Sequence, residues 1–250
     1  MLSKNKIKEL SQLHLKKYRD LQSVFIAEGN KLVLDLLPIF SCKTIVSTAD
    51  WISKNKPKAD EIISVETDGF KKISLLKTPQ EVFAIFRQPN YSFDKKTIIN
   101  SLSLALDDIQ DPGNMGTILR IADWFGIENV FCSLHCADVF NPKTVQASMG
   151  AIGRVKVFQV DLPEFLKEIK SEVPVYGTFL QGNNIYDETL SKNGIIVMGN
   201  EGNGISEKVK NEIDNRLFIP SFPSGRITSE SLNVGSATAV VCGEFRRKSL

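Results

Sequence analysis

The chain has 250 residues, of which 42% are hydrophobic and 24% are charged, as in ordinary globular proteins with one large or two modest domains. The net charge of +2 permits nucleic-acid binding without indicating it strongly. The N-terminus lacks a signal-peptide core, no apolar run has membrane length, and the four cysteines lack a disulfide framework. These features argue against a secreted or membrane protein, and we expect a cytoplasmic one.

The histidine content restricts the chemistry further. The two histidines are His14 and His135, which argues against a histidine base combined with histidine metal ligands. The segment Cys132-x-x-His135-Cys136 is suggestive of a metal site, but a fourth ligand is missing and Cys132 lies in an apolar run. We therefore expect no metal, and thiols that are packed or idle.

Helical and strand-like patterns alternate over the first ninety residues. Residues 4–20 place apolar side chains at helical spacing among many lysines. The elements predicted here are a helix at 4–20, strands at 24–27, 43–46, 62–65 and 82–87, a helix from Gly29 or Asn30, a helix between 46 and 62, and a helix at 67–76. This order predicts a small α/β domain.

A polar segment with one proline, residues 88–94, marks the junction to a second unit. We assign residues 1–90 to the first domain, 91–100 to a linker and 101–250 to the second domain. The second domain has predicted strands at 102–106, 128–132, 154–159, 174–179, 195–198 and 216–219, and helices after Asn114 and at 143–150, 161–170, 205–213 and 233–247. This alternation predicts a parallel sheet wrapped by helices, which binds ligands beyond the carboxyl ends of its strands.

A glycine-rich segment, MGNEGNGIS at residues 198–206, follows one predicted strand. It has no lysine for a Walker loop, and its glycine order and late position do not fit a dinucleotide fingerprint. Glycine lets the backbone turn sharply and lets a flat ligand lie against bare peptide. Glu201 disfavours phosphate and tolerates a positively charged ligand. A simple tight turn into the next helix explains the same pattern equally well.

Two further segments follow strands. In residues 107–116 a turn signal, Asp111-Pro-Gly, precedes a helix that carries Arg120 at its rim. Asn114 then either caps a helix that starts near Met115 or belongs to a ligand site, and Arg120 is either functional or an ordinary surface residue.

The last of these segments, residues 219–235, is the richest in polar groups. Ser229, Ser231 and Asn233 crowd a predicted helix start. Capping explains part of this pattern, but one cap does not need so many polar groups.

Together the three segments resemble the SpoU/TrmH family of RNA ribose 2′-O-methyltransferases, within the knotted SPOUT superfamily. The resemblance spans about residues 100–248. The residues that carry it are Asp111-Pro-Gly-Asn114-Met-Gly116 with Arg120 and Ala122-Asp-Trp-Phe125-Gly126, Val197-Met-Gly199-Asn-Glu201-Gly-Asn-Gly204, and Ile219-Pro220 with Ser231-Leu-Asn233-Val234. More weakly, Lys16-Lys-Tyr-Arg19, Ala27-Glu-Gly29 and Thr78-Pro-Gln80 make the N-terminal part similar to the ribosomal-protein-like RNA-binding domain often fused in front.

The resemblance implies a trefoil-knotted domain with a parallel sheet, preceded by a small α/β RNA-binding domain. It also implies methyl transfer from S-adenosylmethionine to a ribose 2′-hydroxyl, on ribosomal RNA rather than transfer RNA, by a homodimer paired through the C-terminal domain. The implied catalytic residues are Asn114, Arg120, Glu201, Ser231 and Asn233. The implied cofactor-binding residues are Thr178, Met198, Gly199, Asn200, Glu201, Gly202, Gly204, Ile219, Pro220, Ser231, Leu232 and Asn233.

Basic residues suggest where RNA binds, although runs of charge are often only solvated faces. The expected contacts are Lys16, Lys17, Arg19, Arg120 and Arg226. Arg226 lies in a stretch, residues 221–230, that is longer than usual for the family. Two other readings stay open: a catalytically silent RNA-binding protein with the same fold, and an unrelated nucleotide-binding α/β enzyme.

Overall fold

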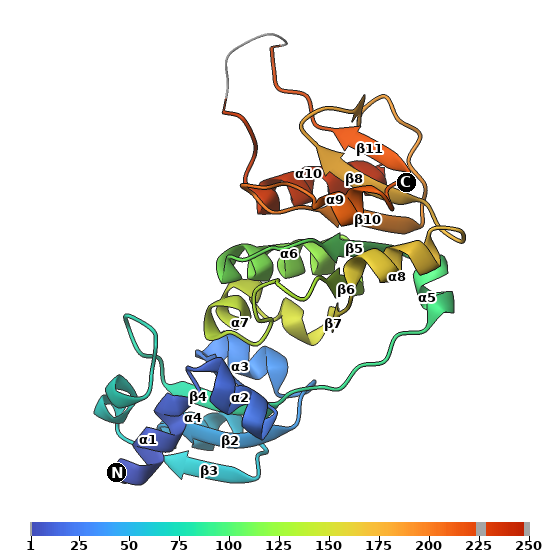
Figure 1. Ribbon diagram of the computed structural model, residues 1–250. Helices are drawn as coiled ribbons and strands as arrows, with labels where there is room; N and C mark the ends of the chain where they lie inside the picture. The colour runs from blue at the N-terminus through green and yellow to red at the C-terminus, as the bar shows by residue number, and fades with distance from the viewer. Residues whose placement is uncertain (1, 224–228, 248–250) are drawn as a thin grey trace. The chain divides into compact units, whose positions relative to one another are not determined.

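The computed structural model describes residues 2–223 and 229–247, and its backbone divides into two compact units (Figure 1). The first unit contains the chain up to Asn90 together with Asp138–Gly153, and the second contains Tyr91–Ala137 and the chain from Arg154 onward. In the described part of the chain, no helix is long and apolar enough to cross a membrane.

The first unit has a four-stranded sheet in the order β1-β4-β2-β3. β4 is antiparallel to both β1 and β2, and β2 is parallel to β3. The strands are β1 (Val24–Glu28), β2 (Cys42–Ser47), β3 (Glu61–Ser64) and β4 (Val82–Arg87). The helices are α1 (Lys4–Gln12), α2 (Lys16–Gln22), α3 (Asn30–Leu36), α4 (Ala49–Asn55), α7 (Pro142–Ser148) and the 3-10 helices η1 (Thr67–Lys72) and η2 (Ala151–Gly153).

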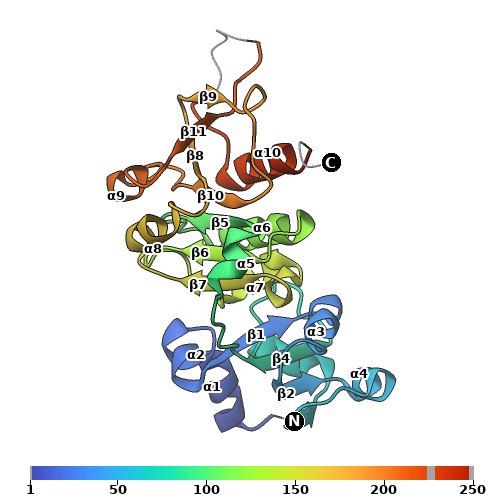
Figure 2. The same ribbon diagram turned by 90° about the vertical axis from the view of Figure 1, so that its right-hand side faces the viewer.

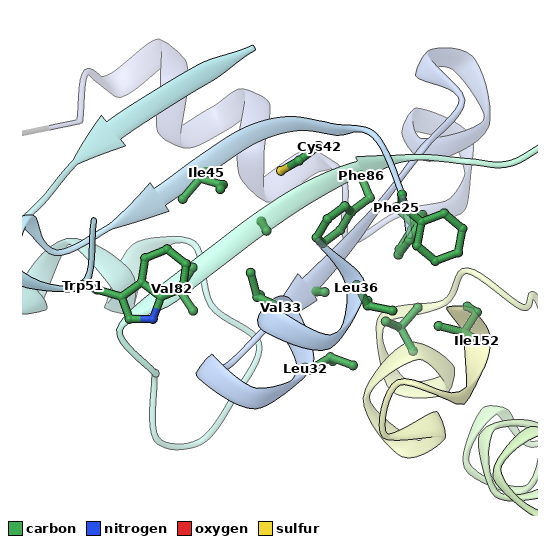
Figure 3. Packing of buried hydrophobic residues seen from close by; sticks show 14 residues of the cluster. Phe25, Leu32, Val33, Leu36, Cys42, Ile45, Trp51, Val82, Phe86 and Ile152 are labelled. Atoms are coloured by element: carbon green, nitrogen blue, oxygen red, sulfur yellow. The ribbon is translucent and has the colours of Figure 1, made fainter. Parts of the chain in front are cut away.

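An aromatic cluster explains why α7 joins the first unit (Figure 3). Phe25 on β1 stacks on Phe86 at 5.5 Å and on Phe140 at 5.0 Å between ring centroids. Val145 and Ile152 are buried in the same cluster. Burial of these apolar side chains holds residues 138–153 against β1 and α3.

Three differences between the observed and the predicted elements concern the domain division, the linker and the first helix. Residues 138–153 group with the first unit, whereas the sequence-based division leaves them in the second domain. Part of the predicted linker is helical, as α5 (Lys95–Ile99). The predicted helix at 4–20 is two helices, because the chain turns where Leu13 is buried and Leu15 is extended.

The second unit has a seven-stranded sheet in the order β7-β6-β5-β10-β8-β11-β9, and all its ladders are parallel. The strands are β5 (Leu102–Leu106), β6 (Asn129–Cys132), β7 (Lys156–Gln159), β8 (Val175–Phe179), β9 (Asn183–Asn184), β10 (Gly194–Met198) and β11 (Asn215–Phe218). Every residue of β5 and β10 is buried, as expected for central parallel strands. Figure 2 shows β10 beside β5.

Four further helices belong to this unit: α6 (Pro112–Trp124), α8 (Leu162–Ile169), α9 (Glu207–Lys210) and α10 (Val234–Arg247). α6 begins earlier than predicted, because the Asp111 carboxylate accepts a 2.8 Å hydrogen bond from the Asn114 N–H and Pro112 occupies the first turn. Asp111 is therefore the cap of this helix, and the Asn114 side chain is left for another role.

Candidate active site

The glycine loop, residues 199–205, is a closed turn at the carboxyl end of β10. Asn200 and Gly204 exchange backbone hydrogen bonds of 3.0 and 2.8 Å. Inside the turn, Asn200 Oδ1 accepts from the N–H groups of Gly202 at 2.9 Å and Asn203 at 3.0 Å.

Two glycines make this turn possible. Gly204 has φ +67°, where side-chain-bearing residues are disfavoured. A Cβ at Gly199 would lie 2.5 Å from the Ile205 nitrogen and 2.7 Å from the Gly204 oxygen, which is too close. Glycine at 199 therefore lets the loop close on itself, and the backbone at Gly204 borders open space, because a Cβ there would meet nothing within 4 Å.

The segment that follows β5 anchors this loop. Asp107 N donates to Met198 O at 2.9 Å, and Asp107 Oδ2 accepts from Ser206 N at 2.7 Å. Asn200 Nδ2 donates to the carbonyl of Asp108 at 2.8 Å, and Asp108 has φ +58°. The neighbouring strands β5 and β10 thus deliver two loops that are bonded to each other.

Three predicted catalytic residues meet across this anchor. Asn114, in the first turn of α6, donates through Nδ2 to Glu201 Oε1. Asn233 Nδ2 donates to Asn114 Oδ1 at 3.1 Å. Asn233 Oδ1 also accepts from Gly235 N at 3.0 Å, so it caps α10 as well as contacting α6. Asn114 therefore links side chains of all three sequence segments.

Arg120 lies on α6, and its side chain is exposed. Within residues 2–223 and 229–247, its guanidinium has no hydrogen-bond or ion-pair partner. An exposed arginine without a protein partner offers its donors to an external anion.

The predicted cofactor-binding residues follow the carboxyl ends of three neighbouring strands. Thr178 on β8 donates to Val197 O at 3.3 Å, and Met198 ends β10 with its side chain buried. Ile219 and Pro220 follow β11 and are partly buried. Ser231 and Leu232 are exposed just before α10, at 50% for Leu232. The structure thus places the residues of β8, β10 and β11 at one edge of the sheet and leaves Ser231 and Leu232 on the surface before α10.

The thiol of Cys136 is hydrogen-bonded to the end of β5 and to the segment that follows it. Cys136 Sγ accepts from Ile109 N at 3.3 Å and donates to Leu106 O at 3.2 Å. A hydrogen bond from Cys132, together with those of Ser133 and the backbone, lowers the Cys136 pKa to about 7 against the effect of burial. Burial raises the pKa of Cys42 and of Cys242 to about 12.

The predicted RNA contacts of the first unit are divided by the structure. Lys16 and Lys17 are exposed, as RNA binding requires. Arg19 is only 1% exposed and donates to Leu13 O at 2.9 Å, to His14 O at 2.8 Å and to Asp138. The prediction that Arg19 contacts RNA is therefore wrong, because its guanidinium ties α2 to the turn at 13–14 and to the segment at 138–153. Arg226 lies outside the described residues.

A cavity of about 370 Å³ lies in the first unit and is lined by two of the three segments that carry the N-terminal resemblance. Its lining includes Glu28 and Gly29 from one segment and Gln80 from the other. Glu28 is 6% exposed and accepts from Ser74 Oγ and from Leu75 N, so its carboxylate is engaged within the protein.

Across residues 2–223 and 229–247, no cluster of three or more potential metal ligands occurs.

The fold is a parallel α/β sheet whose carboxyl edge carries these backbone loops, which is the edge where such sheets bind ligands. Comparison with known proteins identifies the family of each domain. Residues 101–243 match the SpoU rRNA methylase family, and residues 4–84 match the MRM3-like substrate binding domain.

Relatives of full length agree with these matches. The Bacillus subtilis 23S rRNA (guanosine(2553)-2′-O)-methyltransferase RlmP is 31% identical over 96% of each chain. A TrmH-family structure from Porphyromonas gingivalis is 43% identical, with a TM-score of 0.90 over 99% of both chains. An rRNA methyltransferase from Sinorhizobium meliloti, solved with AdoMet bound, is 30% identical, with a TM-score of 0.86 over 100% of this chain and 97% of that one.

The chain belongs to the SpoU rRNA methylase family. It is an RNA ribose 2′-O-methyltransferase that uses S-adenosylmethionine, and its fold is an α/β fold with a parallel sheet behind an N-terminal substrate-binding domain. The family, fold class, activity and methyl donor predicted from the motifs are confirmed.

The residues of the site fit this methyl donor on two observations. A Cβ at Gly204 would meet nothing within 4 Å, so bare backbone borders open space there, as an adenine or ribose would need. Glu201 places a carboxylate, rather than a lysine, at the tip of the loop, which suits a ligand with a positive sulfonium.

Proposed function

We propose that the protein methylates a ribose 2′-hydroxyl of ribosomal RNA in the cytoplasm, with Arg120 as the group that acts on the reacting ribose. The observation that carries this proposal is the contact of Asn114 with Glu201 and Asn233, which joins the donor loop to the helix of Arg120. The B. subtilis relative is named for 2′-O-methylation of 23S rRNA, which favours ribosomal RNA. A catalytically silent protein would have no need to keep these groups together.

The chemistry needs few protein groups. S-adenosylmethionine supplies a methyl group on a sulfonium that is already a good leaving group, so neither a metal nor a covalent enzyme intermediate is required. The protein must orient the ribose hydroxyl in line with that methyl group, and the hydroxyl proton passes to solvent water as the new C–O bond forms and the C–S bond breaks. Arg120, Asn114 and the loop residues have to provide this orientation.

Arg120 acts in this proposal as a cation rather than as a base. A guanidinium stays protonated in proteins, so it is a very poor proton acceptor. Its free N–H groups can instead hold the neighbouring phosphate and stabilise the oxyanion that develops on the 2′-oxygen. Asn114 orients the first turn of this helix against Glu201, and Ser231 and Asn233 complete the site from the last segment.

The C-terminal segment is proposed to form the family's knot and to pair two subunits. Two hydrogen bonds support a fixed path for α10 along α6: Arg246 donates to Phe125 O at 2.7 Å and to Gly126 O at 3.0 Å. With Asn233 bound to Asn114 at the other end, both ends of α10 are bonded to α6.

RNA binding is proposed to begin in the N-terminal unit. Lys16 and Lys17 are exposed there, and phosphate neutralisation by such lysines contributes salt-dependent affinity. Residues 221–230, which include Arg226, are proposed to contact RNA near the reaction site.

Mapping of modified riboses tests the proposed target. Ribosomal and transfer RNA from a strain that lacks the gene should be incubated with the purified protein and methyl-labelled S-adenosylmethionine, and the 2′-O-methyl positions mapped. We expect one labelled ribose in ribosomal RNA. Label in transfer RNA alone would refute the target, and absence of label in both would refute the proposed activity.

A further inference from the structure

Asp107 attracted no prediction from the sequence beyond its place in the first segment, yet its side chain is bonded to the exit of the glycine loop. It is 5% exposed, directly after the last residue of β5. Its Oδ2 accepts from Ser206 N at 2.7 Å, which is the short distance expected of a charged acceptor. A buried carboxylate is costly without such a donor, so this bond fixes where the glycine loop ends.

The loop entrance is fixed from the same short segment. Asp107 N donates to Met198 O, and the carbonyl of Asp108 accepts from Asn200 Nδ2 at 2.8 Å. Asp108 can point its carbonyl there because it adopts φ +58°, and its own N–H is held by Ser133 Oγ at 2.9 Å. Residues 107 and 108 therefore hold both ends of a turn that is already closed internally by Asn200 and Gly204.

We infer that Asp107 is a positioning residue for the methyl donor: it sets the glycine loop in its ligand-binding position relative to α6. The inference rests on the proposed function, because it takes the loop to be the donor site. Asp107 acts through the backbone of Ser206 and not on the reacting atoms. Its loss should therefore weaken donor binding and leave the chemical step, once the donor is bound, nearly unchanged.

The primary test is Asp107→Ala, which removes the acceptor and leaves Ser206 N–H unpaired. Calorimetry with S-adenosylmethionine should show a dissociation constant raised about tenfold or more, the range for a lost bond to a charged group. In the transfer assay on ribosomal RNA, KM for the donor should rise with it, and kcat should stay within about threefold. Wild-type affinity in this variant, or a fall in kcat with KM unchanged, would overturn the inference.

The chain offers a control in the same sheet, an aspartate that is exposed where Asp107 is buried. Asp214 Oδ2 likewise accepts a backbone N–H, from Val175 at 3.0 Å, but at the amino end of β8. Asp214→Ala should lower thermal stability without changing donor affinity more than about twofold. Equal losses of affinity in both variants would mean that Asp107 supports the fold only, which would overturn the inference.

A backbone substitution tests the same bond from its other side. Ser206 has φ −65°, which proline adopts, so Ser206→Pro removes the N–H without forcing φ. It should weaken donor binding as Asp107→Ala does. The double variant should bind the donor about as well as the single variant with the lower affinity, because both substitutions remove the same hydrogen bond. Additive losses would refute the coupling.

Two further outcomes are covered by this design. If Asp107→Ala does not fold, Asp107→Asn keeps an acceptor oxygen of the same shape, and we expect its dissociation constant to rise only a few-fold, less than that of Ser206→Pro. Wild-type affinity in Ser206→Pro would then overturn the inference. If the wild-type protein itself fails to bind S-adenosylmethionine, the proposed function fails, which is a different result from failure of this inference.

Discussion

The glycine loop and the basic N-terminal segment differ in how directly their residues indicate a role in the folded protein. The glycine loop is a closed turn at the ligand edge of its sheet, where a Cβ at Gly199 has no room. In the basic segment, Lys16 and Lys17 are exposed and Arg19 is buried. Glycine reports a steric requirement of the backbone, whereas a positive charge in a sequence does not report its own exposure.

The largest expected effect separates the two kinds of basic residue. Arg19→Ala removes the ion pair with Asp138 and the two hydrogen bonds to Leu13 O and His14 O, so the free energy of unfolding should fall by about 3 kcal/mol. Lys16→Ala is the matched control on the same helix, and it should change stability by less than about 0.5 kcal/mol. Urea unfolding measures both, and a stable Arg19→Ala with weakened RNA binding would restore Arg19 as an RNA contact.

The next effect concerns a glycine of the loop and a glycine outside the site. Gly199→Ala pushes Gly204 and Ile205 away from residue 199, so donor affinity should fall about tenfold or more. Gly243→Ala, on α10, is the control, because its Cβ would make only ordinary contacts with Phe125, the nearest at 3.6 Å. Calorimetry with S-adenosylmethionine should find near-normal binding for Gly243→Ala alone. Equal affinities of the two variants would contradict the closed form of the loop.

The smallest effect is a pH dependence in the basic segment. His14 donates to Ile73 O at 2.9 Å, and burial lowers its pKa below the ordinary value of 6.5. The folded state therefore resists protonation of His14. Its contribution to stability is complete above the unfolded pKa and is lost as pH falls from that value through the lower folded pKa. Urea unfolding should show that the free energy of unfolding falls more between pH 7.5 and pH 5.5 for the wild type than for His14→Gln, which cannot titrate at this position. The same fall in both proteins would exclude His14 as a source of the pH dependence.

Local patterns predicted the elements best where one signal dominates. The apolar runs at 82–87 and 102–106 are β4 and β5 with the predicted bounds. The helix predicted at 205–213 is shorter, because Ser206 stays extended and gives its N–H to Asp107. The affiliation of residues 138–153 depends on the burial of Val145 and Ile152 beside Phe25, which no local pattern reveals.

The candidate site was predictable in its residues and not in its connections. Asn114 and Glu201 are 87 positions apart, and only the parallel pairing of β5 with β10 brings their loops together. The role of Asp107 could not be predicted from the sequence, because a buried aspartate after a strand has no recognisable pattern until its hydrogen-bond donor is known. Arg19 was misassigned because its acceptors, among them Asp138, lie on segments that the sequence does not place beside it.

The central claim is that the three loops hold the methyl donor while Arg120 acts on the RNA ribose. Its most direct test is Arg120→Ala, with donor affinity measured by calorimetry and single-turnover transfer measured on ribosomal RNA. We expect affinity within about twofold of wild type and a transfer rate lowered at least about a hundredfold, as for a lost group that stabilises developing charge. Transfer at a near-normal rate by this variant would contradict the account.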